Sequence, residues 1–231
     1  VYGMHNIPGI KVGEFAVCPG PIMAARDNFE VFVKGRGSHA AMPHQGVDPV
    51  VVGSHIVLAL QTITSRNMDP QKSLVVSVTQ FHAGEAFNII PDEIILRGTC
   101  RVLDPQIQET LPERLGRIVD GVASTFGAKA ELVYHKGYPA TVNSEQASEF
   151  CAEVAKEIAG SNEAVDLKPA PSMGAEDFSY MLQKKPGCYI WTGNGDTAGL
   201  HHPAYDFNDE TIAVGASYWA RLVEKRLPKS P

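Results

Sequence analysis

The chain has 231 residues, 44% of them hydrophobic, which is enough for one large core or two modest ones. Its formal net charge is −6 and its lysines and arginines form no stripe, so nucleic acid is excluded as an expected partner. No apolar run reaches the roughly 18 residues of a membrane-spanning helix, and no signal-peptide pattern is visible. We therefore expect a soluble, cytoplasmic protein with no membrane partner.

The four cysteines lie far apart in the sequence and include no Cys-x-x-Cys pair; they are Cys18, Cys100, Cys151 and Cys188. This spacing favours free, mostly buried thiols, although four cysteines could also form disulfides in three pairings. The chain opens without a methionine, and its first residues resemble the end of a buried strand. This start suggests a fragment or a processed form. Beyond that strand-like start, residues 1–24 are rich in glycine and proline and are expected to be irregular.

The segment from Asn28 to His135 contains a regular succession of strands and helices. Phe29, Val31 and Val33 alternate with polar residues, as in a half-buried strand. Asp48 is expected to cap a helix that runs to about residue 66. Strands are expected at 73–81, 92–102 and 130–134, and a second helix at about 108–126, with Pro112 starting or kinking it. The order β-α-β-β-α-β predicts a ferredoxin-like domain.

After residue 137 the pattern changes to helices at about 144–159, 175–184 and 209–226, with one strand at 188–192. These elements need partners that residues after 137 do not supply, and we expect the missing ones to precede the first residue. Residues 26–136 are therefore predicted to be a domain inserted into an α/β domain, of which residues 1–25 and 137–231 form a part.

Two histidine-containing segments are candidates for metal binding. His201 and His202 lie in a loop that follows a predicted strand, where sheet proteins often place ligands. Two surface histidines without function are the simpler alternative. His5 follows a short apolar stretch, and a lone histidine of this kind is more often structural. Glu176 and Asp177 begin a predicted helix, so capping explains them at least as well as chemistry does.

Polar residues in the inserted domain could contact a substrate. His39 lies in a glycine-flanked loop together with His44, and Asn88 interrupts an apolar loop. Arg101 lies at the end of a predicted strand, and a guanidinium can hold a carboxylate through two parallel hydrogen bonds. Solvent exposure, structural hydrogen bonding and a surface ion pair are the respective alternatives.

Taken in order, short motifs along the whole chain resemble one family, the hippurate hydrolases, aminoacylases and auxin-conjugate hydrolases, which are two-metal amidohydrolases and peptidases. The matching segments are YGMHN (2–6), PGPIMA (19–24), GRGSHAAMP (35–43), DP (48–49), NIIP (88–91), GTCR (98–101), GAEDF (174–178) and LHHP (200–203). The resemblance implies an α/β metal-binding catalytic domain carrying a ferredoxin-like lid or dimerisation domain. It also implies a homodimer formed through that lid.

The resemblance assigns a role to each matching site residue. His5 and His201 are implied ligands of two divalent ions, which could be manganese, zinc, cobalt or nickel. His201 is preferred to its neighbour because it directly follows the leucine of the family's L-H-x-P pattern. His39 is the implied catalytic residue that contacts the substrate and polarises the scissile carbonyl, often from a neighbouring subunit. Asn88 and Arg101 are the implied substrate-binding pair. The implied reaction is hydrolysis of an N-acyl amino acid to a carboxylic acid and an amino acid.

The sequence departs from the family in one respect. The family's first metal-binding motif and its Glu-Glu pair, which supplies a base and a ligand, occur nowhere in the 231 residues. The chain is thus expected to be a C-terminal fragment that is inactive alone. The alternative functions are those of a dipeptidase, a carboxypeptidase, a ureido-acid amidohydrolase or a dimerisation module without catalytic activity.

Overall fold

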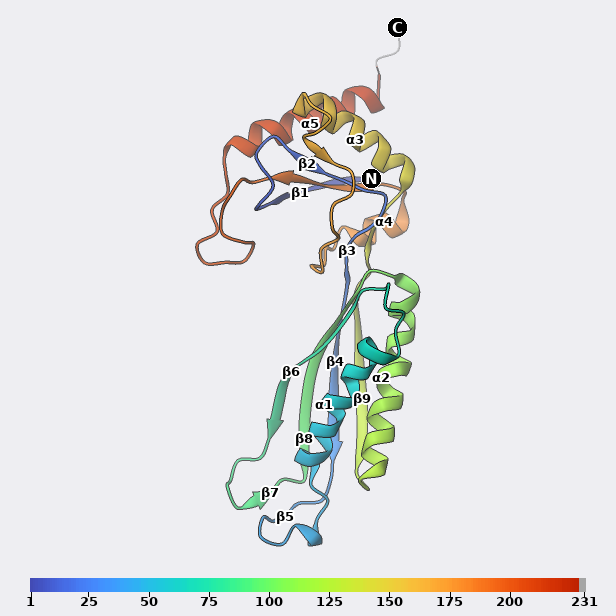
Figure 1. Ribbon diagram of the computed structural model, residues 1–231, viewed down its shortest axis with the longest axis vertical. Coiled ribbons are helices and arrows are strands. Elements are labelled where there is room, and N and C mark those ends of the chain that lie inside the picture. The colour runs from blue at the N-terminus through green and yellow to red at the C-terminus, as the bar shows by residue number, and fades with distance from the viewer. Residues whose placement is uncertain (229–231) are drawn as a thin grey trace. The chain divides into compact units, whose positions relative to one another are not determined.

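The computed structural model describes residues 1–228, which form two compact units (Figure 1). A ferredoxin-like unit comprises residues 24–140 and 173–175. An α/β unit comprises residues 1–23, 141–172 and 176–228. Each unit has a hydrophobic core of its own.

The ferredoxin-like unit has a four-stranded antiparallel sheet in the order β6-β8-β4-β9. Its elements are β4 (Ala25–Lys34), β5 (Ser38–His39), a 3-10 turn (Pro43–Gln45), α1 (Pro49–Arg66), β6 (Leu74–Ala83), β7 (Ile89–Ile90), β8 (Glu93–Val102), α2 (Pro105–Thr125) and β9 (Lys129–Tyr138). The short strands β5 and β7 pair with each other at one end of this sheet (Figure 1). The predicted α/β class and the β-α-β-β-α-β order are confirmed.

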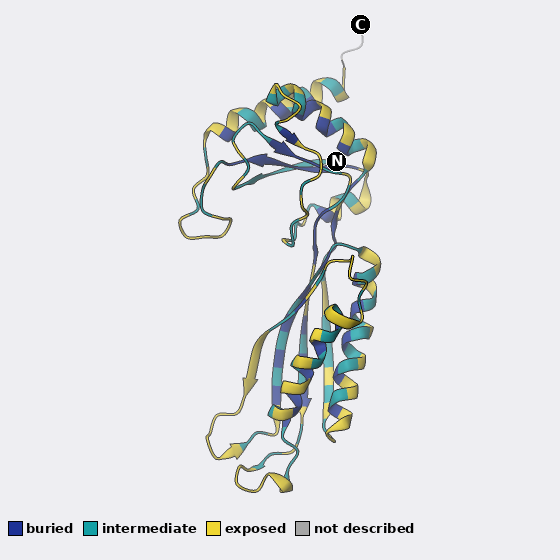
Figure 2. Cartoon of the chain, in the orientation of Figure 1, coloured by how far each residue is buried: buried dark blue, intermediate teal, exposed yellow. Residues whose placement is uncertain are grey.

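Strict alternation along β4 and β8 gives this sheet two different faces (Figure 2). One face packs against α1 and α2, and the buried residues of β4 on that face are Ala25, Asp27, Phe29, Val31 and Val33. The other face, here called the open face, carries the intervening side chains, because successive residues of a strand point to opposite sides. On β4 and β8 these include Arg26, Glu30, Arg97, Thr99 and Arg101.

Both helices of this unit begin with an Asp-Pro pair. The Asp48 carboxylate accepts a hydrogen bond of 2.8 Å from the Val50 N–H at the start of α1. The Asp104 carboxylate does the same for Gln106 at 2.9 Å, so α2 begins three residues earlier than predicted. Pro112 does not start the second helix, as one of the two predicted alternatives had it, because this proline lies inside α2. It lacks an N–H and leaves one carbonyl of the preceding turn without its usual partner.

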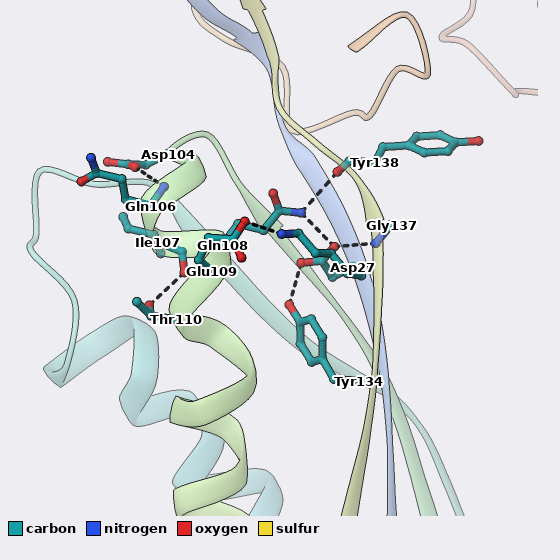
Figure 3. A network of polar contacts seen from close by, with 11 residues as sticks. Asp27, Asp104, Gln106, Ile107, Gln108, Glu109, Thr110, Tyr134, Gly137 and Tyr138 are labelled. Carbon is teal, nitrogen blue, oxygen red and sulfur yellow. Dashed lines mark hydrogen bonds and ion pairs between the residues drawn. The ribbon is translucent and has the colours of Figure 1, made fainter. Parts of the chain in front are cut away.

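A buried carboxylate joins three segments of the ferredoxin-like unit (Figure 3). Asp27 is 2% exposed, and its Oδ1 accepts hydrogen bonds from Gln108 Nε2 at 2.9 Å and from the Gly137 N–H at 2.8 Å. Its Oδ2 accepts a hydrogen bond of 2.6 Å from the Tyr134 hydroxyl. These contacts join β4 to α2 and to both halves of β9, so the charge is buried with partners on each oxygen.

The α/β unit contains a mixed sheet in the order β1-β12-β2-β11, in which β1 and β12 are parallel. Its elements are β1 (Tyr2–Ile7), β2 (Phe15–Ala16), β3 (Gly20–Met23), β10 (Thr141–Asn143), α3 (Glu145–Ala159), β11 (Val165–Asp166), α4 (Ser179–Lys184), β12 (Cys188–Gly193) and α5 (Glu210–Arg226). The strands β3 and β10 form a separate two-stranded pair. Helices α3 and α5 pack on one face of the mixed sheet.

The expectation of an irregular stretch at residues 1–24 was wrong. Strands β1, β2 and β3 lie there, and they pair with segments more than a hundred residues away in the sequence. The strand β12 was expected to need partners that precede the first residue, but both of its neighbours in the sheet, β1 and β2, belong to this chain. The helix predicted at 175–184 is shorter, because α4 begins only at Ser179.

All four cysteines are free, and three of them are buried, as the sequence indicated. Burial raises the pKa of the Cys100 thiol to about 12, so this thiol stays protonated at neutral pH. Among residues 1–228, no helix is long and apolar enough to cross a membrane.

Candidate active site

His5 lies on β1, on the face of the mixed sheet opposite α3 and α5. Its neighbours on that face are Gly3, which packs against the Tyr189 ring, and Ile7, which joins the core around Trp191. The His5 Nδ1 lies 2.6 Å from the backbone oxygen of Asn6. Because that oxygen can only accept, Nδ1 is the donor, and in the neutral ring Nε2 then keeps its lone pair. In this tautomer His5 can bind a metal ion through Nε2.

His201 has a backbone conformation that stands out in the described part of the chain. With φ at 66° it is the only residue other than glycine with positive φ among residues 1–228. Such a conformation is unfavourable for a side chain with a Cβ and is concentrated at functional sites. The adjacent His202 has a structural contact instead, because its Nδ1 accepts a hydrogen bond of 3.0 Å from the Ala204 N–H. The local geometry therefore separates the two histidines.

The loop that carries His201 is fixed to the strand that carries His5. Asn6 donates through Nδ2 to the Tyr205 hydroxyl and, at 3.2 Å, to Asn194 Oδ1. Asn194 in turn donates to the Asp206 carbonyl at 2.9 Å and accepts from the Asn208 N–H at 3.0 Å. Because β1 and β12 are parallel, the loops that follow them leave the same edge of the sheet, where open α/β sheets bind ligands.

Glu176 lies within electrostatic reach of His5 on the same face of the sheet. Its Oε2 accepts a hydrogen bond of 2.5 Å from the Tyr189 hydroxyl, and its Oε1 accepts one of 3.3 Å from the Phe178 N–H. Burial raises the pKa of Glu176, but the hydrogen bonds from Tyr189 and Phe178, together with Asp177 and the charge of His5, hold the pKa below its ordinary value. The predicted capping role was wrong, because α4 begins only at Ser179 and its N-cap, Phe178, has no side-chain capping hydrogen bond. Nothing in the sequence pointed to Tyr189.

The two imidazoles fit the chemistry of a transition-metal site, since His5 has a free Nε2 and His201 is held in a strained conformation. Among residues 1–228, however, no group of three or more histidine, cysteine, aspartate or glutamate side chains is placed to hold a metal ion. The described residues therefore offer a partial ligand set.

His39 and Asn88 come together at one end of the ferredoxin-like sheet. His39 on β5 is paired with Ile89 on β7, and the Ala40 N–H donates to the Asn88 carbonyl at 3.0 Å. The His39 Nδ1 accepts a hydrogen bond of 3.1 Å from the Ala41 N–H. In the neutral ring the proton is then on Nε2, which makes this exposed atom a hydrogen-bond donor.

Arg101 lies at the other end of the same sheet. Arg101 lies nine positions after Asp92, whose carboxylate accepts a hydrogen bond of 2.7 Å from Gly37 beside the His39 strand. At about 3.4 Å per residue, the two ends are about 30 Å apart. Within one chain the structure thus does not bring Arg101 together with His39 or Asn88.

The Arg101 side chain is held by its own strand. Its Nη1 donates to the Thr99 hydroxyl and, at 3.0 Å, to the Cys100 carbonyl. Burial and the nearby charge of Arg26 lower the pKa of Arg101. Arg26 was not singled out in the sequence, because its cross-strand pairing with Arg101 is a tertiary feature.

Comparison with known proteins identifies the family. Residues 1–225 match the sequence pattern of peptidase family M20/M25/M40. The chain belongs to this family. An N-acetyl-L-cysteine deacetylase of Bacillus subtilis is 37% identical over 227 residues, covering 98% of this chain and 53% of that protein. A hippurate hydrolase of Campylobacter jejuni is also 37% identical over 227 residues, covering 98% of this chain and 59% of that protein.

A solved structure of the M20 family shows the same fold. The Bacillus subtilis YXEP protein, a dinuclear metal binding peptidase, superposes with a TM-score of 0.80 at 30% identity, over 98% of this chain and 56% of that one. The chain therefore spans little more than half the length of the M20 relatives that it matches.

Proposed function

We propose that the protein carrying this chain is a metal-dependent amidohydrolase that cleaves an N-acyl amino acid into a carboxylic acid and an amino acid. The observation that carries the proposal is the strained His201, in a loop fixed to the strand of His5. Similarity to a hippurate hydrolase and to an N-acetyl-L-cysteine deacetylase supports the substrate class.

In this proposal, His5 and His201 are the ligands that the chain supplies to two divalent ions, with manganese, zinc, cobalt and nickel as candidates. When bound, such ions polarise the amide carbonyl and activate the nucleophile. His39 Nε2 donates a hydrogen bond to the carbonyl oxygen, which gains negative charge in the transition state. Asn88 holds the same part of the substrate, and Arg101 binds its free carboxylate.

The distance between the two ends of the ferredoxin-like sheet supports a homodimer. One small substrate cannot contact both His39 and Arg101 of the same chain across about 30 Å. If both act on one substrate, they must come from different subunits. The exposed edge strand β6 and the exposed Leu58 on α1 suit a dimer formed through the lid.

The test compares substitutions in the protein that carries this chain. His201→Ala is expected to abolish hydrolysis of hippurate and N-acetylcysteine and to lower metal content measured by elemental analysis, and His5→Ala to do the same. His202→Asn is the matched control, because an asparagine oxygen can still accept from the Ala204 N–H. Full activity and metal content in His201→Ala would refute the proposal.

A complementation experiment tests the shared site. His39→Ala is expected to reduce kcat roughly 100-fold with metal retained, and Arg101→Ala to raise KM for carboxylate-bearing substrates. Mixed His39→Ala and Arg101→Ala subunits should recover roughly a quarter of wild-type activity, because half the dimers then contain one intact site. No recovery in verified mixed dimers would place both residues outside a shared site.

Carboxypeptidase activity is a second candidate. Thermostable carboxypeptidase 1 of Saccharolobus solfataricus is 34% identical over 231 residues, covering 97% of this chain and 58% of that protein. Arg101 suits a C-terminal carboxylate as well as that of an N-acyl amino acid. Comparing hippurate with unblocked dipeptides distinguishes the two, since a blocked amine is required only in the first case.

A further inference from the structure

Two arginines face each other on the open face of the ferredoxin-like sheet. Arg26 on β4 is the direct cross-strand partner of Arg101 on β8. Directly opposed like charges destabilise a sheet, so this pairing has a cost in the absence of a compensating group. The Arg26 guanidinium also lies over the Tyr138 ring, 5.6 Å from its centroid. Tyr138 and Thr99 thus fix the positions of the two guanidiniums.

Neither arginine forms an ion pair among residues 1–228, although the charge of the buried Asp27 acts on Arg101. The adjacent Asp27 points to the helix-covered face, where its oxygens are occupied by Gln108, Tyr134 and Gly137 (Figure 3). Further along the same open face, Arg97 is neutralised by Glu30, with Nε and Oε1 2.6 Å apart. The sheet therefore pairs one of its open-face arginines with a carboxylate and leaves Arg26 and Arg101 without an ion pair.

We propose that Arg26 and Arg101 form one anion site that selects substrates with two carboxylates, such as N-acylated glutamate or aspartate. This inference rests on the proposed function, in which Arg101 binds the α-carboxylate. Arg26 then binds the second carboxylate, carried by the substrate's side chain. A dianion matches the two positive charges and removes their mutual repulsion, whereas a monoanion leaves one guanidinium unpaired. Arg26 is thus a specificity-determining residue.

The test measures binding of N-acetyl-L-glutamate and N-acetyl-L-glutamine to the purified chain by titration calorimetry. These probes differ only in whether the side chain ends in a carboxylate or an amide. We expect the dianion to bind at least about tenfold more tightly. Arg26→Gln should reduce this ratio to about one by weakening only the dianion, whereas Arg101→Gln should weaken both probes. Arg97→Gln is the matched control on the same face and should leave the ratio unchanged.

Equal affinity for the two probes, or a ratio that survives Arg26→Gln, would overturn the inference, as would absence of binding by either probe. Failure of this inference can be told apart from failure of the proposed function. Hydrolysis of N-acyl amino acids with an unchanged ratio in Arg26→Gln would refute the anion site alone. The expected ratios in a protein that hydrolyses no amide and binds no metal would refute the function and leave the site standing.

Discussion

Replacement of Asp27 by alanine tests whether the ferredoxin-like unit depends on its buried carboxylate. The substitution removes the carboxylate to which Gln108 Nε2, the Tyr134 hydroxyl and the Gly137 N–H donate, and Gln108 Nε2 keeps only its 3.4 Å contact with the Tyr138 carbonyl. Each unsatisfied buried donor costs about 1–3 kcal/mol, and removing a buried charge recovers part of that cost. We expect the free energy of unfolding of this unit to fall by about 3–5 kcal/mol.

Asp27→Asn is the matched control. The two donors that share Oδ1 can still donate to an amide oxygen, and the Tyr134 hydroxyl can rotate to accept from the new amide nitrogen. We expect this variant to lose only about 1–2 kcal/mol, which is the difference between a charged and a neutral acceptor.

The assay is urea unfolding followed by two probes. Both tryptophans, Trp191 and Trp219, lie in the α/β unit, so their fluorescence should change little in either variant. Hydrogen exchange of β4 and β9 amides reports the ferredoxin-like unit and should show the loss. If Asp27→Ala and Asp27→Asn were equally stable, the unpaired donors would not be the cause and the reasoning would fail.

Three further predictions concern packing, capping and ionisation. Gly98→Ala should destabilise the protein by about 2–4 kcal/mol, because the new Cβ would lie 2.3 Å from both the Phe29 ring and the Ser77 carbonyl. Gly121→Ala in α2 is the control: its Cβ would meet nothing within 4 Å, so it should stabilise the protein by about 0.5–1 kcal/mol. Equal urea midpoints for the two variants would contradict this prediction. Asp48→Ala should cost about 1 kcal/mol through loss of the α1 cap, with unchanged stability as the contrary result. Burial raises the pKa of the Tyr134, Tyr189 and Tyr218 hydroxyls in the folded state. The stability that these groups contribute is therefore complete below the unfolded pKa of about 10 and is lost as the pH rises further. Absorbance at alkaline pH should show that the three tyrosines ionise only as the protein unfolds, and their titration in the folded protein would refute this.

Local patterns were sufficient to predict the ferredoxin-like unit. Alternation of Phe29, Val31 and Val33 specified a strand with one buried face, and the Asp48-Pro49 pair specified where α1 begins. The start of α2 was predicted three residues too late, although the Asp104-Pro105 pair carries the same signal, because Pro112 was taken as a possible start of the helix. Ordered short motifs led to the family, which the comparisons then showed. The roles of the individual site residues remain predictions.

Long-range pairing decided what the sequence could not. Strand β1 is stabilised by β12, about 186 residues later, and short strands with distant partners carry little periodic signal of their own. The strained backbone of His201 and the free Nε2 of His5 likewise depend on contacts of the folded chain. The pairing of Arg26 with Arg101 is set by the register of two strands that a helix and another strand separate in the sequence. By itself the sequence determined which side chains were available and the local elements that carry them. Only the tertiary structure decided which of them face one another, because strand register is set by packing of the whole sheet.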